Sequence, residues 1–426
     1  MTIESGPLVV LGLLAAKTAV ELVLGVLNLK EGRRKRGAVP VAFVDVINKD
    51  DYDKTLDYTA SKQRFGMVTE VFDAVILAAL VLGVLPWVYD ILDGILPRGL
   101  GWSALLMILL MLVLSLPSLP LDWWSQFRIE EKYGFNKSTR GLWISDKLKG
   151  ALVAIFLAWP LVVSLFWIFK NFPQNWWVWG WGLFFGFQLV MTVLYPMCIL
   201  PLFNKLTPLE DGDLRSSLMG LANRAGFKAQ TIQVIDGSKR SAHSNAYFTG
   251  FGKFRRIVLY DTLIEHLSPR ELMAVLAHEI GHYKKGHVPQ MLAVSAVMSF
   301  GGFWLLNWMT QQDGLRKQFG FELFKFDDGR PEFLPVLLVF ALCIGVFTFW
   351  LGPFFNFWSR KNEYEADAFA RDVMNDPQPL VAALRGLHAK NLSNLVPHPA
   401  YSFFHYSHPT LLEREAALKP EPSKSP

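Results

Sequence analysis

Cysteine and charge are both scarce in this 426-residue sequence. The two cysteines, Cys198 and Cys343, lie inside apolar runs, which excludes a CxxC zinc site and argues against a disulfide framework. Charged residues make up 19% of the chain, compared with about 25% in typical soluble domains. The formal net charge is +5 and is spread along the chain, so it does not indicate a nucleic-acid-binding protein.

Apolar and aromatic side chains are abundant instead. Hydrophobic residues reach 52% and aromatic residues 14%, a composition typical of proteins in a lipid bilayer. A helix that crosses a bilayer needs about 20 apolar residues. The sequence opens on MTIESGPLVV, without a basic segment or a cleavage site, so we expect its first apolar stretch to be a retained anchor. The stretches long enough to span a bilayer are 6–29, 70–96, 101–124, 149–170, 176–203, 287–310 and 331–357.

Two charged residues interrupt the first predicted span. Lys17 and Glu21 are four residues apart, so on a helix they share one face. They either pair with each other or both face a water-filled cavity, because ionisable side chains rarely face lipid. The sequence supports the two interpretations equally.

Basic residues in the loops predict the orientation in the membrane. Residues 30–36, after the first span, hold five basic side chains, and residues 128–140, after the third, hold four. The loops at 97–100 and 171–175 hold one and none. Because basic loops stay in the cytoplasm, we expect the N-terminus outside and the C-terminus inside.

Two segments are polar enough to fold in water on the cytoplasmic side. Residues 205–286 and 358–426 flank the last two predicted spans, and together they form the expected catalytic part. Residues 287–357 hold these two spans and their loop, and residues 1–204 hold the other five spans. The sequence therefore predicts a mostly helical membrane protein with a small polar domain built from two separate segments.

Short β-like runs and one strongly signalled helix occur in the first polar segment. The runs are Thr231–Ile235, Asn245–Thr249 and Arg256–Tyr260, and the last two predict a hairpin around Gly250 and Gly252. A helix is then predicted from the capping-box pattern, with Ser268 as N-cap, Pro269 in the first turn and Glu271 three residues after the cap.

That helix carries the motif His-Glu-x-x-His. His278 and His282 are four residues apart, so they project from one face and can bind one zinc ion. Glu279 lies beside the metal on this helix, where it can take a proton from water and return it to a leaving amine. Two histidines satisfied on a helix surface are the alternative interpretation.

A catalytic zinc needs a third protein ligand and an open position. The acidic helical stretch SRKNEYEADAFARD follows the last span. Glu363 and Asp367 share one face of it, whereas Glu365 points about 200° away. We predict Glu363 as the third ligand and Asp367 as an acceptor that orients a ligating imidazole. A solvated acidic helix face is the alternative.

Other histidines are candidates for lesser roles. His287 begins the sixth predicted span, and we expect it to be an interfacial cap rather than a ligand. His408 precedes a proline in a loop that leads into a helix with Arg414, and this pair is predicted to stabilise the oxyanion of a tetrahedral intermediate. His405 is a further candidate in the same segment.

These motifs resemble those of the integral-membrane zinc CAAX prenyl endopeptidases of the type I, a-factor-converting family. HEIGH, SRKNEYEAD and YSHPTLLER carry the resemblance first. It extends to EEKYGFNKST (130–139), PLFNKLTPLEDG (201–212) and SKRSAHSNAYFTG (238–250), and so covers most of the chain.

The resemblance implies a fold, a cofactor and an activity. The fold would be seven transmembrane helices around a water-filled chamber, with a small α+β, gluzincin-like zinc protease domain closing its cytoplasmic end. The cofactor would be one Zn²⁺, with His278, His282 and Glu363 as ligands and Glu279 as the base. The activity would be cleavage after a prenylated cysteine. The segment Asn245, Ala246 and Tyr247 would form an edge strand that binds the substrate, since an extended peptide can pair with such a strand.

The substrate and the compartment are left open by the sequence. The C-terminal tail lacks a dibasic retention signal, which fits bacterial members at least as well as eukaryotic ones. The membrane would be the inner membrane of a bacterium, or the endoplasmic reticulum or inner nuclear membrane of a eukaryote. A quality-control protease for misfolded membrane proteins is an alternative, and so is a transporter or scaffold with structural zinc. The expected partners are the bilayer and a peptide or protein substrate.

Overall fold

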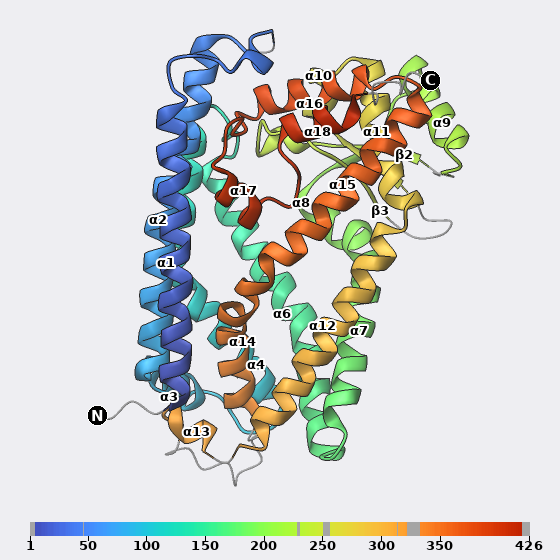
Figure 1. Ribbon diagram of the computed structural model, residues 1–426. Helices are drawn as coiled ribbons and strands as arrows, with labels where there is room; N and C mark the ends of the chain where they lie inside the picture. The colour runs from blue at the N-terminus through green and yellow to red at the C-terminus, as the bar shows by residue number, and fades with distance from the viewer. Residues whose placement is uncertain are drawn as a thin grey trace, which may run out of the picture.

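The computed structural model describes residues 5–45, 47–227, 231–249, 256–312, 314–321 and 333–419. Long helices run along most of the molecule, and shorter helices and a small sheet gather at one end (Figure 1). The first helix begins at the opposite end from this cluster. Residues 322–332, between the last two predicted spans, and residues 420–426 lie outside the described residues.

Seven helical segments in the described part of the chain, some made of consecutive helices, are long and apolar enough to cross a membrane. This confirms the expected spans. The second begins at Lys49 rather than near residue 70, so it starts in a polar segment. The seventh is followed from Phe333, because residue 331 is not among those described. Their helices are α1 (Ser5–Arg34), α2 (Lys49–Ala79) with α3 (Leu85–Asp93), α4 (Leu100–Ser115) with α5 (Leu119–Trp124), α6 (Arg140–Asn171), α7 (Trp176–Leu194) with α8 (Leu200–Phe203), α12 (His287–Thr310), and α14 (Phe333–Thr348) with α15 (Gly352–Met374).

The spans enclose cavities of two kinds. An apolar cavity of about 680 Å³ lies between α6, α7, α12 and α14. A polar cavity of about 550 Å³ is lined by residues of α1 and α2 and by asparagines and tyrosines of the C-terminal segment. The first cavity is thus apolar and lies among membrane helices, whereas the second is polar and lies beside the C-terminal segment.

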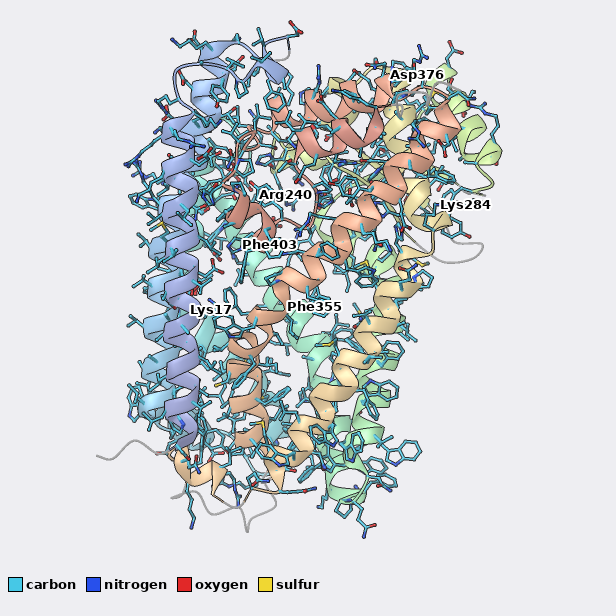
Figure 2. All side chains as sticks on the ribbon, in the orientation of Figure 1. Lys17, Arg240, Lys284, Phe355, Asp376 and Phe403 are labelled. Atoms are coloured by element: carbon cyan, nitrogen blue, oxygen red, sulfur yellow. The ribbon has the colours of Figure 1, made fainter. Side chains whose placement is uncertain are left out.

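The charged residues of the first span pair across helices. Lys17 Nζ lies 2.5 Å from Glu70 Oε1 of α2 (Figure 2 labels Lys17). Glu21 Oε2 lies 3.4 Å from Nε2 of His405, which ends α17 (Pro399–His405). Of the two interpretations left open by the sequence, pairing of Lys17 with Glu21 is wrong, because each side chain lies beside a partner on another element.

The polar end of the molecule contains a four-stranded sheet in the order β1-β2-β4-β3. β2 and β4 are parallel, whereas β1–β2 and β3–β4 are antiparallel. The antiparallel register of β3 and β4 confirms the predicted hairpin, although its connection with Gly250 and Gly252 lies outside the described residues. The strands are β1 (Leu206–Pro208), which the sequence did not predict, β2 (Thr231–Ile235), β3 (Ala246–Thr249) and β4 (Arg256–Tyr260).

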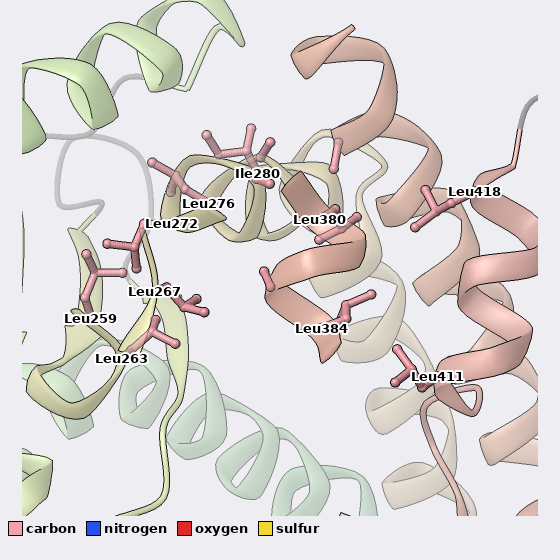
Figure 3. Close-up of a cluster of buried hydrophobic side chains, with 14 of the residues drawn as sticks. Leu259, Leu263, Leu267, Leu272, Leu276, Ile280, Leu380, Leu384, Leu411 and Leu418 are labelled. Atoms are coloured by element: carbon pink, nitrogen blue, oxygen red, sulfur yellow. The ribbon is translucent and has the colours of Figure 1, made fainter. Parts of the chain in front are cut away.

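One helix, α11 (Pro269–Lys284), forms the centre of this part. Leu272, Leu276 and Ile280 recur every four residues and are 1–2% exposed, so they form one buried face. They lie in one hydrophobic cluster with leucines of α16 (Figure 3). The remaining helices are α9 (Asp213–Arg224), α10 (Asp261–His266), α16 (Gln378–Lys390) and α18 (Leu411–Leu418), and α13 (Leu315–Gln318) lies between spans at the opposite end.

Two membrane helices continue directly into the polar part. α11 and α12 are separated only by Lys285 and Gly286, and the glycine adopts a left-handed conformation (φ 72°) that turns the chain from one helix into the other. α15 follows α14 after one short turn and runs through residue 358 without a break. The metal motif and the acidic motif therefore lie on elements joined to the sixth and seventh spans.

Candidate metal centre

The start of α11 is fixed by its capping box. Ser268 Oγ accepts from the backbone N–H of Glu271, and Glu271 Oε2 accepts from the backbone N–H of Ser268 at 2.7 Å. This confirms the predicted N-terminus of the helix. Because the opposite face is buried in the core, His278 and His282 both point toward α15.

Three side chains place their ligand atoms around one point. His278 Nε2 lies 3.2 Å from His282 Nε2 and 3.5 Å from Glu363 Oε2. His282 Nε2 lies 3.3 Å from Glu363 Oε1. Ligand atoms about 2.0–2.2 Å from a tetrahedral ion would be roughly 3.3–3.5 Å apart. The two imidazole nitrogens and the Glu363 carboxylate, whose two oxygens face different histidines, are thus close enough to surround one ion.

The donor set also fits a metal chemically. Glu363 is 4% exposed, and its Oε2 has no hydrogen-bond partner in the described part of the chain. A buried carboxylate oxygen without a partner is costly, and a metal ion would supply the missing interaction. Two imidazoles and one carboxylate with a fourth position open are the ligands of a catalytic site rather than of a closed structural one.

A glycine lets the two ligand-bearing helices approach closely. A Cβ added at Gly281 would lie 2.9 Å from the Cα and 3.0 Å from the carbonyl oxygen of Ala366 on α15. A backbone contact of this kind leaves no room for a larger residue. Gly281, between the two histidines of the motif, thus allows Glu363 to come within reach of them.

A second set of contacts holds His278. Its Nδ1 lies 2.8 Å from Asp367 Oδ1. Arg414 of α18 donates to both oxygens of Asp367, at 2.8 and 2.5 Å. Burial lowers the pKa of His278, but hydrogen bonds with Asp367 and Glu363 outweigh it and raise the value to about 9.

Glu279 lies beside this cluster in a partly buried position. Burial raises the pKa of its carboxyl above the ordinary value, and the Glu363 carboxylate adds to the increase, whereas His278 and His282 oppose it. A carboxylate with a raised pKa is a stronger base, and a pKa closer to neutral allows the same group to take a proton and later return it.

His408 and Arg414 occupy different positions in the site. His408 Nε2 lies 3.3 Å from Glu363 Oε1, and its side chain is 64% exposed, so a substrate can reach it. It also lines a polar cavity of about 340 Å³. Arg414 is 7% exposed and bound to Asp367, with Nη1 3.6 Å from Glu363 Oε2. Arg414 thus contacts Asp367 and, from the buried side, two of the candidate ligands, His278 and Glu363.

His287 is not the interfacial cap that we expected from the sequence. It is 2% exposed, and its Nδ1 lies 2.9 Å from Nδ1 of His282. Its Nε2 lies 3.3 Å from Glu365 Oε2. The correction follows from the left-handed turn at Gly286, which directs the first residue of α12 back toward the motif. The histidine five residues after the motif was the available signal.

The strand predicted to bind substrate lies at an edge of the described sheet. β3 pairs with β4 on one side and packs beside α11. Asn245, just before it, is exposed, and its side-chain oxygen accepts from the backbone N–H of Ala246. Burial raises the pKa of Tyr247 to about 12, so its hydroxyl keeps its proton at neutral pH.

Residues 130–139 and the start of the block 238–250 lie together in the structure. The ring of Phe135 stacks on His243 with 4.0 Å between centroids. Asn136 forms a β-bridge with Ser241, and Tyr58 donates to Glu130 at 2.8 Å. The loop after the third span therefore supports the segment that leads into β3.

Comparison with known proteins identifies the family. A model described as the CAAX prenyl protease N-terminal region, five membrane helices, matches residues 28–205, and one described as peptidase family M48 matches residues 208–421. The chain is 37% identical over 404 residues to "CAAX prenyl protease 1" of Saccharomyces cerevisiae, covering 89% of this chain and 88% of that protein. The chain belongs to peptidase family M48.

Further relatives of this M48 peptidase agree over nearly the whole length. The "CAAX prenyl protease 1 homolog" of Oryza sativa subsp. japonica is 38% identical and covers 93% of this chain and 94% of that protein. The human homolog is 31% identical over 89% and 88%. The crystal structure of S. mikatae Ste24p superposes with a TM-score of 0.89 at 32% identity, covering 98% of this chain and all of that one. The predicted family and fold class are confirmed, and the protein is a multi-pass membrane metalloendopeptidase.

Proposed function

We propose that this M48 peptidase is a zinc enzyme that hydrolyses peptide bonds near the C-terminus of prenylated CAAX proteins. Its similarity to proteins named CAAX prenyl protease 1 supports the substrate class. The observation that carries the proposal is the cluster of His278, His282 and Glu363, whose ligand atoms all lie within 4.8 Å of one another.

The proposed ligands are the Nε2 atoms of both histidines and the carboxylate of Glu363. Imidazole and carboxylate ligands with an open position are typical of catalytic zinc. When bound, zinc would supply a Lewis acid that polarises the scissile carbonyl and makes water more acidic. The residues around it would then bind the peptide, move protons and hold the ligands in place.

Glu279 is the proposed general base. It takes a proton from the attacking water as the water oxygen bonds to the carbonyl carbon, and it gives this proton to the amide nitrogen as the carbon–nitrogen bond breaks. The products are a carboxylic acid and an amine, and transfer of the remaining water proton from the acid to the amine gives a carboxylate and an ammonium group. His408, which is exposed beside the cluster, is proposed to donate a hydrogen bond to the carbonyl oxygen as negative charge develops there.

Arg414 and Asp367 are proposed to act through His278. The bidentate hydrogen bonds of Arg414 fix the Asp367 carboxylate, which in turn accepts from Nδ1 of His278. This leaves Nε2 of His278 free to bind metal. Arg414 is therefore proposed as a positioning residue as well as a source of positive charge near the intermediate.

The edge strand β3 is the proposed binding site for the peptide backbone. A peptide in extended conformation could pair with Asn245, Ala246 and Tyr247 and lie along α11. The orientation in the membrane is proposed from charge. Arg33 and Arg34 end α1 at the same end of the bundle as the metal cluster, and such basic ends face the cytoplasm.

The test compares a farnesylated CAAX peptide with the same peptide unmodified. Both are incubated with the zinc-loaded full-length protein in detergent, and the products are identified by mass spectrometry. We expect cleavage after the modified cysteine, with release of the three C-terminal residues. Equal rates on both peptides would overturn the prenyl preference and favour a quality-control protease.

A matched pair of variants tests the chemistry. Glu279→Gln should lower the rate by about 10²–10⁴-fold while zinc stays bound, because general acid–base catalysis contributes this much. Glu265→Gln, on an exposed residue of α10, should leave the rate unchanged. Full hydrolysis by Glu279→Gln would overturn the assignment of the base.

A further inference from the structure

His287 connects a proposed ligand to a carboxylate on another helix. Its Nδ1 lies 2.9 Å from His282 Nδ1, and its Nε2 lies 3.3 Å from Glu365 Oε2. The three side chains come from α11, α12 and α15. His287 is 2% exposed, so its ring is held in place by the packing around it.

His287 is unsuited to be a ligand itself. The cluster of ligand atoms within 4.8 Å contains His278, His282 and Glu363. His287 faces Nδ1 of His282, which is the ring nitrogen away from His278 and Glu363. Its contact is thus with the back of the His282 ring.

The positions of the protons follow from this arrangement. If Nε2 of His282 binds metal, its proton must be on Nδ1, which then donates to Nδ1 of His287. A neutral imidazole has one N–H, so His287 carries its proton on Nε2 and donates it to Glu365. Each nitrogen of both rings then has a defined role.

We propose that His287 and Glu365 are positioning residues for the metal, acting through His282. They fix the tautomer and the orientation of its ring, in the way that Asp367 and Arg414 do for His278. Partners of this kind make a ligating imidazole more basic, and their loss weakens metal binding about 10–100-fold. The inference rests on the metal assignment proposed above. It adds a second set of contacts, in which the imidazole of His287 links His282 to Glu365, and we call this set the relay.

The position of Glu365 strengthens the argument. It follows Glu363 by two residues on α15, so one helix supplies both the third ligand and the end of the relay. Helix α12 supplies the ring between them as its first residue. The relay therefore ties together the three helices that meet at the metal, and it would resist rotation of any one of them.

The experiment measures zinc affinity by competition with a chromophoric chelator, and the absorption spectrum of the Co²⁺-substituted protein. His287→Leu should bind zinc 10–100-fold more weakly and alter the Co²⁺ spectrum. His287→Gln should restore most of the affinity, because a carboxamide can also accept on one atom and donate on another. Glu365→Ala should weaken binding several-fold, because it removes the acceptor for the Nε2–H of His287. Asp372→Asn, an exposed acid on the same helix that pairs with its neighbour Arg371, should have no effect.

Glu365→Ala decides the matter if the His287 variants fail to fold, because the Glu365 side chain is 40% exposed and tolerates replacement. Wild-type zinc affinity and an unchanged Co²⁺ spectrum in this variant would overturn the relay. A wild-type protein that binds neither zinc nor cobalt would instead overturn the proposed function. The measurement uses no substrate, so it is independent of whether prenylated peptides are cleaved.

Discussion

Glu363 is the proposed ligand that comes from outside α11, and it is surrounded by positive or proton-bearing groups. Nitrogens of His278, His282, His408 and Arg414 all lie 3.3–3.6 Å from its oxygens. This environment favours the ionised carboxylate despite its burial. A negative charge held in this way can neutralise half the charge of a divalent ion.

The first prediction at the residue scale concerns this carboxylate. Glu363→Ala should lose its zinc on dialysis, because two imidazoles alone do not hold a catalytic zinc. Metal content by mass spectrometry is the measurement. Asp372→Ala, on an exposed acid of the same helix, is the matched control, and it should still bind one zinc. If Glu363→Ala kept the metal, the ligand assignment would be wrong.

The second prediction concerns pH. The metal-free protein holds the pKa of His278 at about 9, so the ring carries a proton below that pH. A ligand must be neutral, so zinc binding releases this proton, and the apparent affinity should rise about tenfold per pH unit from pH 6 to 8. It should level off above pH 9. Chelator competition at several pH values gives the slope.

Asp367→Asn is the control for this pH effect. Removing the carboxylate removes a group that raises the pKa of His278, so the levelling should move to lower pH. A zinc affinity that is independent of pH between 6 and 8 would contradict the prediction, because no proton would then be displaced.

At the scale of elements, the site depends on how closely α11 and α15 cross. The added Cβ of Gly281 would lie within 3.0 Å of two backbone atoms of Ala366, and backbone atoms cannot rotate away as side-chain atoms do. The helix axes would have to separate. Since His282 lies on α11 and Glu363 lies on α15, the distance between these two proposed ligands would increase too.

Gly281→Ala is therefore predicted to weaken both folding and metal binding. Overpacking of this kind costs about 1–3 kcal/mol. We expect a lower melting temperature in detergent and lower zinc affinity. Gly150→Ala, on α6 with open space around its Cα, should be neutral or slightly stabilising because alanine favours helix. Equal melting temperatures for both variants would show that the helices do not need this close approach.

Sequence patterns predicted the helices and strands better than the contacts between them. Local signals such as the capping box at Ser268 and the four-residue spacing of His278 and His282 depend only on helix geometry, and the structure shows α11 beginning where they indicated. The partner of Lys17 could not be predicted, because Glu70 is 53 residues away and meets it through helix packing. A periodic pattern does not contain that information.

The role of His287 was missed for a similar reason. Its sequence position, at the start of a predicted span, suggested an interface with the membrane surface. The left-handed turn at Gly286 was not anticipated, and it changes which way the residue faces. β1 was also missed, since its three residues include Pro208 and the strand exists only by pairing with β2. Tertiary contacts determine features of this kind.

At the scale of the whole molecule, an ion pair joins the peptidase part to the membrane part. Arg240 precedes β3 and donates to both oxygens of Asp146 on α6, at 2.8 and 2.9 Å (Figure 2 labels Arg240). Both side chains are 22% exposed, so the pair is partly shielded from water. It lies next to the contact between Asn136 and Ser241.

We predict that Arg240→Ala and Asp146→Ala each lower the melting temperature and that the double variant is no worse than either. The coupling should be ~1 kcal/mol, between the values for exposed pairs and for shielded charged hydrogen bonds. The exposed pair formed by Lys147 on α6 and Asp122 on α5 is the control and should show almost none. Strictly additive effects for Arg240 and Asp146 would mean that the two side chains stabilise the protein separately.

The continuity of α11 with α12 and of α14 with α15 has a consequence for dissecting this enzyme. A cut placed at either junction would sever a helix that bears a ligand or its support from the hydrophobic segment that anchors it. Neither junction is therefore a suitable place to truncate the chain in order to obtain a water-soluble catalytic domain. The helices that carry the metal motif and the acidic motif are thus continuous with helices that cross the membrane. We therefore expect that the peptidase part cannot be separated from the membrane spans without losing activity.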